Sequence, residues 1–170
     1  MSGNIILIGF MATGKTAAGR ALAKKLRKKY VSTDTLVEKK ARKKVRTIFR
    51  DKGEPYFRGL ETAALKSLKG KKNLVISCGG GIVLKPQNRL LLKKLGTVVW
   101  LKASPEAVNR RLGPLKQRPL LNIKQKHKRL AKIKEMLRDR GPAYKKSAGV
   151  SVDTSSLSLA QVVQKIASVI

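Results

Sequence analysis

The segment from Gly9 to Thr16 constrains the fold of this chain more than any other feature. It reads Gly-Phe-Met-Ala-Thr-Gly-Lys-Thr and matches the phosphate-binding pattern G-x-x-x-x-G-K-[ST] without a mismatch. An apolar run precedes it and a segment of helical period follows it, so we expect a strand, a turn and a helix. In such a turn the backbone N–H groups surround phosphate oxygens, and the helix directs the positive end of its dipole at them.

The motif predicts that the chain binds ATP with Mg²⁺. We expect Lys15 to reach the β- and γ-phosphates and the Thr16 hydroxyl to bind the magnesium ion. The other residues predicted to bind the nucleotide are Gly9, Ala12, Thr13 and Gly14 of this segment, and Ala17 directly after it.

The rest of the chain has the pattern of an α/β protein. Apolar runs of strand length alternate with longer segments of helical period, which predicts a doubly wound parallel sheet with ligands at the carboxyl ends of its strands. No repeat and no Pro/Gly/Ser-rich linker divides the 170 residues, so we expect a single domain over 1–170. The expected strands are 4–9, 30–33, 73–78, 97–101 and 149–152.

The expected helices are 16–29, 35–68 with a break near 53–55, 86–95, 104–112, 124–138 and 158–169. Ser104 and Pro105 have the residue types of an N-cap and a first helical position. Residues 113–123 are rich in turn residues, and we expect a mobile loop there.

Cysteine and histidine are too rare for several classes of site. Cys78 is the only cysteine, which excludes an intramolecular disulfide and a cysteine-based metal cluster. His127 is the only histidine, which excludes zinc-hydrolase motifs and argues against a Ser-His-Asp triad. No apolar stretch approaches the roughly 20 residues of a membrane span, and no charged region precedes the first apolar run. We therefore expect a cytoplasmic protein with no membrane association.

The charge of the chain is extreme. Forty Lys and Arg residues against nine Asp and Glu residues give a formal net charge of +31 and a pI of about 11.1. This balance predicts attraction to polyanions, including nucleic acid and acidic membranes. We expect non-specific polyanion binding at low salt, which by itself says nothing about catalysis.

Two further features lie at the ends of predicted strands. Asp34 follows the second strand, where a kinase needs a carboxylate to orient or deprotonate an attacking hydroxyl. The same residue could cap the helix that begins at Thr35, and both roles can hold together. Gly79, Gly80 and Gly81 follow the third strand, and either close approach of a ligand to the main chain or a simple turn accounts for them.

Taken together with further residues, these features resemble the shikimate kinases along nearly the whole length of the chain. The resemblance implies a three-layer α/β/α fold with a five-stranded parallel sheet, a P-loop NTPase of the nucleoside-monophosphate-kinase type. It implies ATP-dependent phosphorylation of the 3-hydroxyl of shikimate. Beyond the P-loop, the matching residues are Thr33-Asp34 with Glu38, Gly53-Glu54, Phe57-Arg58 with Glu61, Gly79-Gly80-Gly81, Arg118-Pro119-Leu120-Leu121, and Arg140 with Pro142, Tyr144 and Ala148.

The resemblance implies roles on the acceptor side. Asp34 would bind the shikimate hydroxyls and act as the base, and Arg58 and Arg140 would hold the carboxylate, which a guanidinium grips with two hydrogen bonds. Glu61 would position Arg58. Gly79, Gly80 and Gly81 would form the wall of the pocket.

The resemblance also implies roles on the nucleotide side. Arg118 would cover the transferred phosphate from a lid over residues 113–123, and its closure would exclude water. Arg110 would stack near the adenine. We expect the enzyme to be a monomer.

The sequence departs from the family pattern at two single positions and in its overall charge. Ser32 stands where the family usually has the first aspartate of Asp-x-Asp, so we expect weaker magnesium binding and reduced turnover. Ala12 replaces a glycine common in the family. Lysine pairs cover the predicted helix faces, whereas five of the nine acids keep family positions; deliberate redesign and selection for basicity both remain open. These five are Asp34, Glu38, Glu54, Glu61 and Asp153.

Three alternatives remain at this point. The first is a basic nucleic-acid-binding module on an inactive P-loop scaffold, supported by the net charge alone. The second is a related small-molecule kinase of the gluconate type, since Arg58 and Arg140 indicate a carboxylate without identifying it. The third is a catalytically inactive descendant, because of Ser32.

Overall fold

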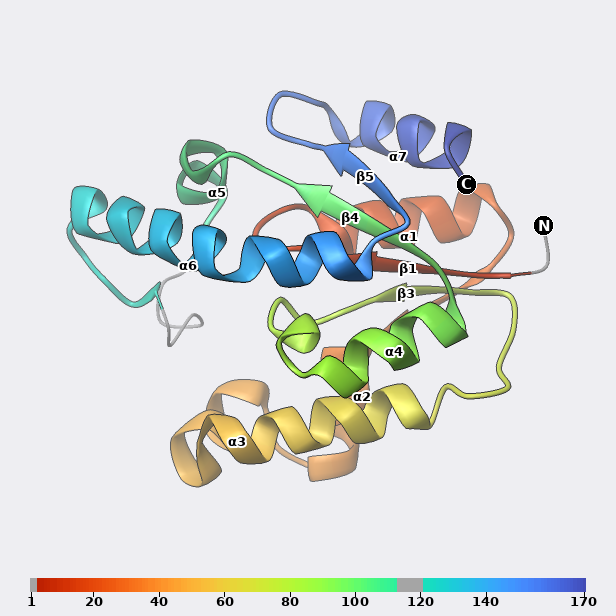
Figure 1. Ribbon diagram of the computed structural model, residues 1–170, viewed down its shortest axis with the longest axis horizontal. Helices are drawn as coiled ribbons and strands as arrows, with labels where there is room; N and C mark the ends of the chain where they lie inside the picture. Colours follow the sequence, from red (N-terminus) through yellow and green to blue (C-terminus); the bar gives the residue numbers. More distant parts are fainter. Residues whose placement is uncertain (1–2, 113–120) are drawn as a thin grey trace.

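The computed structural model describes residues 3–112 and 121–170. Five parallel strands form one sheet in the order β2-β3-β1-β4-β5 (Figure 1). The five-stranded parallel sheet predicted from the sequence is confirmed. Its strands are β1 (Asn4–Ile8), β2 (Lys29–Ser32), β3 (Leu74–Ser77), β4 (Gly96–Lys102) and β5 (Val150–Asp153).

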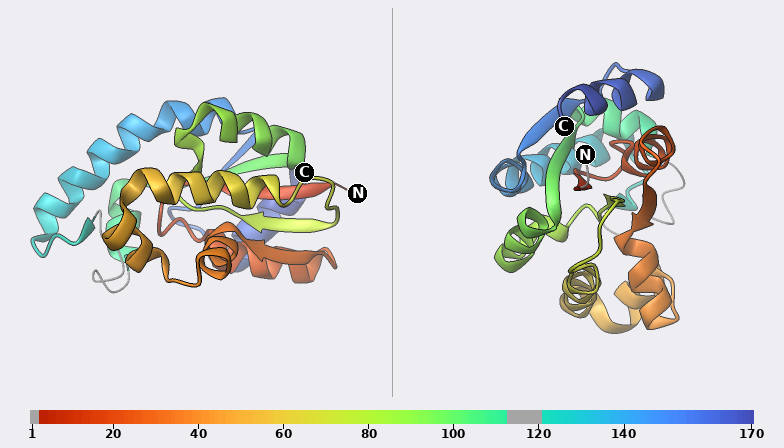
Figure 2. Two further views of the ribbon diagram at one scale, coloured as in Figure 1. Left: turned by 90° about the horizontal axis from the view of Figure 1, so that it is seen from below. Right: turned by 90° about the vertical axis from the view of Figure 1, so that its right-hand side faces the viewer.

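Helices cover both faces of this sheet, as the views in Figure 2 show. Ile5 and Leu7 of the central strand pack against α1 (Lys15–Lys25) and α7 (Leu159–Ser168). Ile6 and Ile8 point to the opposite face, towards α3 (Val45–Lys66), α4 (Pro86–Leu95) and α6 (Lys126–Ser147). All five residues of β1 are buried, as expected for a parallel strand covered on both sides. The predicted three-layer α/β/α architecture is therefore confirmed.

The long segment after β2 contains one break that was predicted and one that was not. The predicted break lies at Gly53, where φ is 76° and ψ is 174°. The second separates α2 (Thr33–Ala41) from α3 at Arg42, whose φ of 51° ends α2 in the left-handed region. Because Arg42 is not a glycine, its residue type did not indicate this break.

Helix α6 is longer than the sequence predicted, since it continues to Ser147 instead of ending near Arg138. Pro142 disfavours such a continuation because proline lacks the amide hydrogen that a helix interior uses. Residues 133, 136, 140, 144 and 147 are buried at helical spacing, so tertiary packing continues the helix through the proline.

Helix caps agree with the sequence at one position and correct it at another. Ser104 accepts a hydrogen bond from the Ala107 amide at 3.1 Å and caps α5 (Pro105–Arg111), as predicted. The cap of α2 is Ser32, which accepts from the Thr35 amide at 3.4 Å. Asp34 therefore lies inside the first turn and is not the cap. No helix in the described ranges, 3–112 and 121–170, is long and apolar enough to cross a membrane.

Candidate active site

The P-loop joins the carboxyl end of β1 to the first turn of α1. Lys15 Nζ donates to the Phe10 carbonyl at 2.6 Å, and Thr13 Oγ1 donates to the same oxygen at 2.8 Å. A Cβ on Gly9 would lie 2.3 Å from the Leu101 carbonyl oxygen, so β4 packs too closely to allow a side chain there. Ala12 has a φ of 60°, a left-handed conformation that a glycine adopts without strain.

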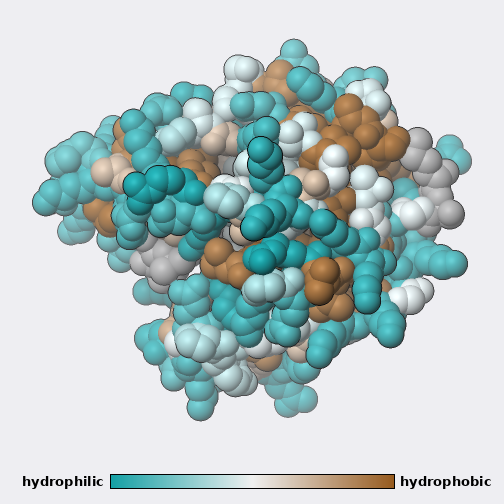
Figure 3. Space-filling view, viewed as in Figure 1, coloured by the Kyte–Doolittle hydropathy of each residue, from teal (hydrophilic) through white to brown (hydrophobic). Residues whose placement is uncertain are grey.

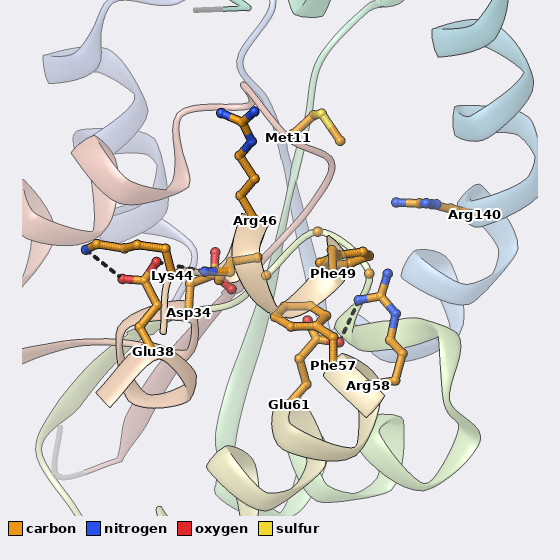
Figure 4. A pocket seen from close by; sticks show the side chains of 14 residues that line it. Met11, Asp34, Glu38, Lys44, Arg46, Phe49, Phe57, Arg58, Glu61 and Arg140 are labelled. Atoms are coloured by element: carbon orange, nitrogen blue, oxygen red, sulfur yellow. Dashed lines mark hydrogen bonds and ion pairs between the residues drawn. The ribbon is translucent and has the colours of Figure 1, made fainter. Parts of the chain in front are cut away.

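An elongated cavity of about 580 Å³ opens beside this loop, at the carboxyl edge of the sheet (Figure 4). It contains all seven residues predicted to bind the acceptor, which come from four separate stretches of the chain. Its lining is Met11, Asp34, Glu38, Lys44, Val45, Arg46, Phe49, Phe57, Arg58, Glu61, Gly79, Gly80, Gly81 and Arg140.

Arg58 is buried and held by two carboxylates on its own helix. Its Nη1 donates to Glu61 Oε2 at 2.6 Å, and its Nη2 and Nε donate to Glu54 Oε1 at 2.6 and 3.1 Å. Burial opposes the charge of Arg58, but the two carboxylates outweigh it and raise the pKa of the guanidinium. Arg58 is thus a permanent cation fixed in one orientation in the cavity.

Gly81 makes room for that guanidinium. A Cβ on Gly81 would lie 2.2 Å from Arg58 Nη2 and 2.3 Å from its Cζ. Real Cβ atoms do not approach other heavy atoms so closely, so any side chain at this position would displace Arg58. The close approach therefore explains this glycine; a simple turn does not require it.

Glu61 is fully buried, and one of its oxygens points at the strand end that holds the glycines. Burial raises the pKa of Glu61 to about 7; Arg58 opposes this rise, and the nearby Asp34 carboxylate adds to it. A Cβ on Gly79 would lie 2.6 Å from Glu61 Oε1 and 2.7 Å from Asp34 Oδ1, so both carboxylates face this glycine. Within the described part of the chain, Glu61 Oε1 has no hydrogen-bond partner.

Tyr144 connects α6 to the glycine wall, a contact that the sequence did not reveal. Its hydroxyl donates a short hydrogen bond to the Gly80 carbonyl, and its ring stacks on Trp100 with 5.6 Å between centroids. Gly80 also borders the P-loop, because a Cβ there would lie 3.4 Å from the Met11 amide nitrogen. The spacing of Tyr144 four residues after Arg140, on one face of α6, was the available signal.

Arg140 enters the cavity from α6, opposite α3 (Figure 4). Its guanidinium lies 5.7 Å from the centroid of the Phe10 ring, a cation–π geometry. Together Arg58 and Arg140 place two guanidinium groups in the cavity, while Asp34 supplies a carboxylate.

Four cavity residues were missed by sequence reasoning: Lys44, Val45, Arg46 and Phe49. They lie at the start of α3, just after the break at Arg42 that was not predicted. In Figure 4 the Arg46 side chain extends towards Met11 of the P-loop. The structure thus adds two cations to the cavity lining.

The predicted nucleotide residues outside the P-loop are placed only in part. Arg118 and residues 113–120 of the predicted lid lie outside the described residues. Arg110 is exposed in the last turn of α5, and its stacking on adenine stays a prediction. Its neighbour Arg111 donates to the Thr154 and Ser155 carbonyls at 2.5 and 3.0 Å, and Thr154 Oγ1 donates to the Thr13 carbonyl at 3.3 Å.

The donor set near the P-loop suits magnesium held mainly by phosphate oxygens and water. No group of three or more His, Cys, Asp or Glu side chains that could hold a metal occurs among the described residues. Mg²⁺ in nucleotide enzymes keeps several water molecules and takes only one or two protein ligands together with substrate phosphates. Thr16 is exposed at the start of α1 and fits that sparse coordination.

Comparison with known proteins gives a consistent result. A family model described as shikimate kinase matches residues 11–170. A shikimate kinase of Pelotomaculum thermopropionicum is 45% identical over 163 residues, which cover 96% of this chain and 92% of that protein. The solved structure of Acinetobacter baumannii shikimate kinase in complex with shikimate has a TM-score of 0.91 at 34% identity, covering 97% of this chain and 90% of the other.

A gluconokinase from Sinorhizobium meliloti is more distant. Its structure has a TM-score of 0.59 at 21% identity, covering 96% of this chain and 88% of that one. At this identity the likeness concerns the fold alone.

Proposed function

The chain belongs to the shikimate kinase family, and we propose that its cavity is where the γ-phosphate of ATP passes to the 3-hydroxyl of shikimate. The products are shikimate 3-phosphate and ADP. One observation carries the assignment: the cavity beside the P-loop gathers Asp34, the two guanidinium groups and the three glycines. The complex of the A. baumannii relative with shikimate supports the same acceptor.

Arg58 and Arg140 would bind the shikimate carboxylate from opposite sides. Each guanidinium can form a charge-assisted pair with a carboxylate, and Glu54 and Glu61 keep Arg58 in place before the substrate arrives. Such preorganisation lowers the ordering cost of binding. The ring of the acceptor would then lie against Gly79, Gly80 and Gly81, with its hydroxyls towards Asp34.

Asp34 would orient the 3-hydroxyl and accept its proton. The freed oxygen bonds to the γ-phosphorus, the bond from that phosphorus to the β–γ bridging oxygen breaks, and ADP leaves with the bond's electrons. Because phosphoryl transfer needs little covalent help from the protein, positioning and charge stabilisation supply most of the rate.

On the nucleotide side, Lys15 and the P-loop amides would neutralise the charge of the β- and γ-phosphates. Magnesium, bound by the Thr16 hydroxyl and phosphate oxygens, would add positive charge at the same place. Ser32 brings no negative charge to this corner, and its hydroxyl caps α2. Weaker magnesium binding and a reduced rate therefore remain our hypothesis.

Several finer points belong to the same proposal. Arg118 and the lid over 113–123 would cover the transferred phosphate, and Arg110 would contact the adenine. We further propose a monomer in the cytoplasm that binds polyanions non-specifically at low salt. That binding rests on counterion release and should fade steeply with added salt.

The test is ADP release measured with shikimate, gluconate, a nucleoside monophosphate or no acceptor. We expect release that depends on shikimate and that falls at least about 100-fold in Asp34→Asn, which keeps the shape of the side chain but loses the base. Faster turnover with gluconate than with shikimate would make gluconate the acceptor instead. Unchanged turnover in Asp34→Asn would remove Asp34 as the base, and no turnover with any acceptor would favour the inactive-scaffold alternative.

A further inference from the structure

The two edges of the sheet differ in charge. Each helix that connects two parallel strands runs back from the carboxyl edge to the amino edge, so α1, α3, α4 and α6 all end at the amino edge. In Figure 1 the ends of α1, α3 and α4 and both chain termini lie on the right, whereas the end of α6 lies nearer the middle; the right panel of Figure 2 is viewed from that side. The cavity lies at the opposite edge.

Exposed lysines end three of these helices in pairs, whereas Lys66 alone ends α3. Lys24 and Lys25 end α1, Lys93 and Lys94 end α4, and Lys145 and Lys146 close the last turn of α6. We call these six residues, with the cations of the adjoining turns, the amino-edge surface. In Figure 3, hydrophilic side chains project from this edge.

The adjoining turns extend the same surface. Lys69, Lys71 and Lys72 are exposed in the turn that joins α3 to β3. Arg27, which has a φ of 51°, and Lys29 are exposed where α1 leads into β2.

Acidic residues are missing from this surface. The described part of the chain has eight ion pairs, and none of them includes a cation of the amino-edge surface. Glu61 lies five residues before the end of α3 but is buried and paired with Arg58. The exposed Asp139 lies eight residues before the end of α6, about 12 Å along the helix axis. No acidic side chain therefore neutralises the lysines and arginines of the amino-edge surface.

We infer that the amino-edge surface is a docking surface for the phosphate backbone of double-stranded nucleic acid, and that docking leaves the active site open. Five strands about 4.8 Å apart place β2 and β5 about 19 Å apart. A duplex carries one charge per ~1.7 Å of axis, so it presents roughly eleven backbone charges over that length. Lysines bind phosphates as point charges and read no base sequence.

Two other occupants fit this surface less well. Single-stranded binding uses exposed aromatic side chains as stacking platforms. Among the residues that the structure describes, Tyr56 is the one strongly exposed Phe, Tyr or Trp side chain, and it lies on α3 near Glu54. Membrane-surface binding uses a row of apolar residues beside the cations. Among the large apolar side chains that are strongly exposed in residues 3–112 and 121–170, only Val169 lies near the helix ends.

Two matched variants test the location of binding. The first variant replaces four lysines of the amino-edge surface by Gln: Lys93, Lys94, Lys145 and Lys146. The second variant replaces four other exposed lysines of α2 and α6 by Gln: Lys39, Lys40, Lys126 and Lys128. Both lower the net charge equally. We would measure the anisotropy of a labelled duplex of about 20 base pairs over a range of salt concentrations, and confirm folding of both variants by thermal unfolding.

We expect the first variant to bind the duplex about tenfold more weakly at ~0.1 M salt, with a shallower salt slope, and the second to change by less than about threefold. Equal losses in the two variants would overturn the proposal, because binding would then depend on total charge alone. Binding of vesicles containing phosphatidylserine without binding of the duplex would overturn it in favour of a membrane.

A second measurement tests whether the active site stays open. Shikimate-dependent ADP release by the wild-type enzyme should keep the same KM for ATP when the duplex is saturating. This arm rests on the proposed function, whereas the anisotropy measurement needs no activity, so the two can fail separately. Inhibition by the duplex that ATP relieves would place the duplex at the active-site edge and contradict the proposal.

Discussion

The two halves of the active site are built in different ways. The phosphate half is one continuous segment, residues 9–16, in which Lys15 and Thr13 both donate to the Phe10 carbonyl. The acceptor half is assembled from four distant stretches, which are Asp34, Arg58 with Glu61, Gly79 to Gly81, and Arg140. Phosphate binding is thus a local property of the chain, whereas acceptor choice depends on how the whole domain packs.

The largest effect should come from filling the space that Arg58 occupies. In Gly81→Ala the new methyl group would collide with the guanidinium, so we expect kcat/KM for shikimate to fall about 100-fold with little change in the KM for ATP. Gly59→Ala is the control, because a Cβ on Gly59 meets nothing within 4 Å. A loss of ATP affinity as large as that of shikimate would show that the two halves are not separate.

Tyr144→Phe tests the support of the glycine wall, which borders both halves at Gly80. The Gly80 carbonyl would lose its donor while Gly80 still borders both the P-loop and the glycine wall, so we expect the KM values for both substrates to rise, by about three- to tenfold. Steady-state kinetics with each substrate varied would measure this, and Tyr56→Phe, whose side chain is half exposed, is the control. If the free energy of unfolding changes while both KM values stay the same, Tyr144 contributes to packing alone.

The acceptor half also holds a buried acid. The pKa of Glu61 is raised from 4.5 to about 7, so the folded protein holds this proton more tightly than the unfolded chain does. The resulting stabilisation is full below about pH 4.5 and is lost as the pH rises through 7. Between pH 5 and 8 we expect the unfolding free energy of the wild type to fall relative to Glu61→Gln by on the order of 1–3 kcal/mol.

Denaturant unfolding at a series of pH values measures that difference. Glu106→Gln is the control, since Glu106 is exposed and its pKa is lowered, chiefly by its own backbone amide. Parallel pH profiles for the wild type and Glu61→Gln would contradict a buried proton on Glu61.

The smallest effect tests the magnesium corner of the phosphate half. Aspartate caps a helix at least as well as serine, so Ser32→Asp should fold normally and add a negative charge at the carboxyl end of β2. We expect the magnesium concentration for half-maximal rate to fall about threefold. Ser104→Asp is the control, because it adds the same charge at the cap of α5. If both variants lower the required magnesium concentration equally, the effect comes from the added charge in general and not from the position of Ser32.

The same contrast between local and assembled features explains how much the sequence could predict. The P-loop and the five strands were predicted within one or two residues because their signals are local: a motif and buried apolar runs. The break at Arg42 and the continuation of α6 through Pro142 depend on tertiary packing. Lys44 and Arg46 were therefore missed as cavity residues, and Tyr144 was noted only as part of a family pattern.

The acceptor residues show what the resemblance contributed. Spacing alone could not separate Arg58 and Arg140 from the other cations among forty. Arg58 and Arg140 line the same cavity because α6 is long enough to bring Arg140 opposite α3. The reasons for Gly79 and Gly81 became visible only with the side chains of Glu61, Asp34 and Arg58 in place.

The most direct test of separate halves is calorimetric binding of shikimate and of ADP, each alone, to the wild type and to Arg140→Leu. Arg138→Leu, an exposed change on the same helix, is the control. We predict that Arg140→Leu weakens shikimate binding by about 10- to 100-fold, the loss of one charge-assisted pair, while ADP binding changes by less than about twofold. Unchanged shikimate binding, or an equal loss of ADP binding, would contradict the assignment of this cavity as the acceptor site.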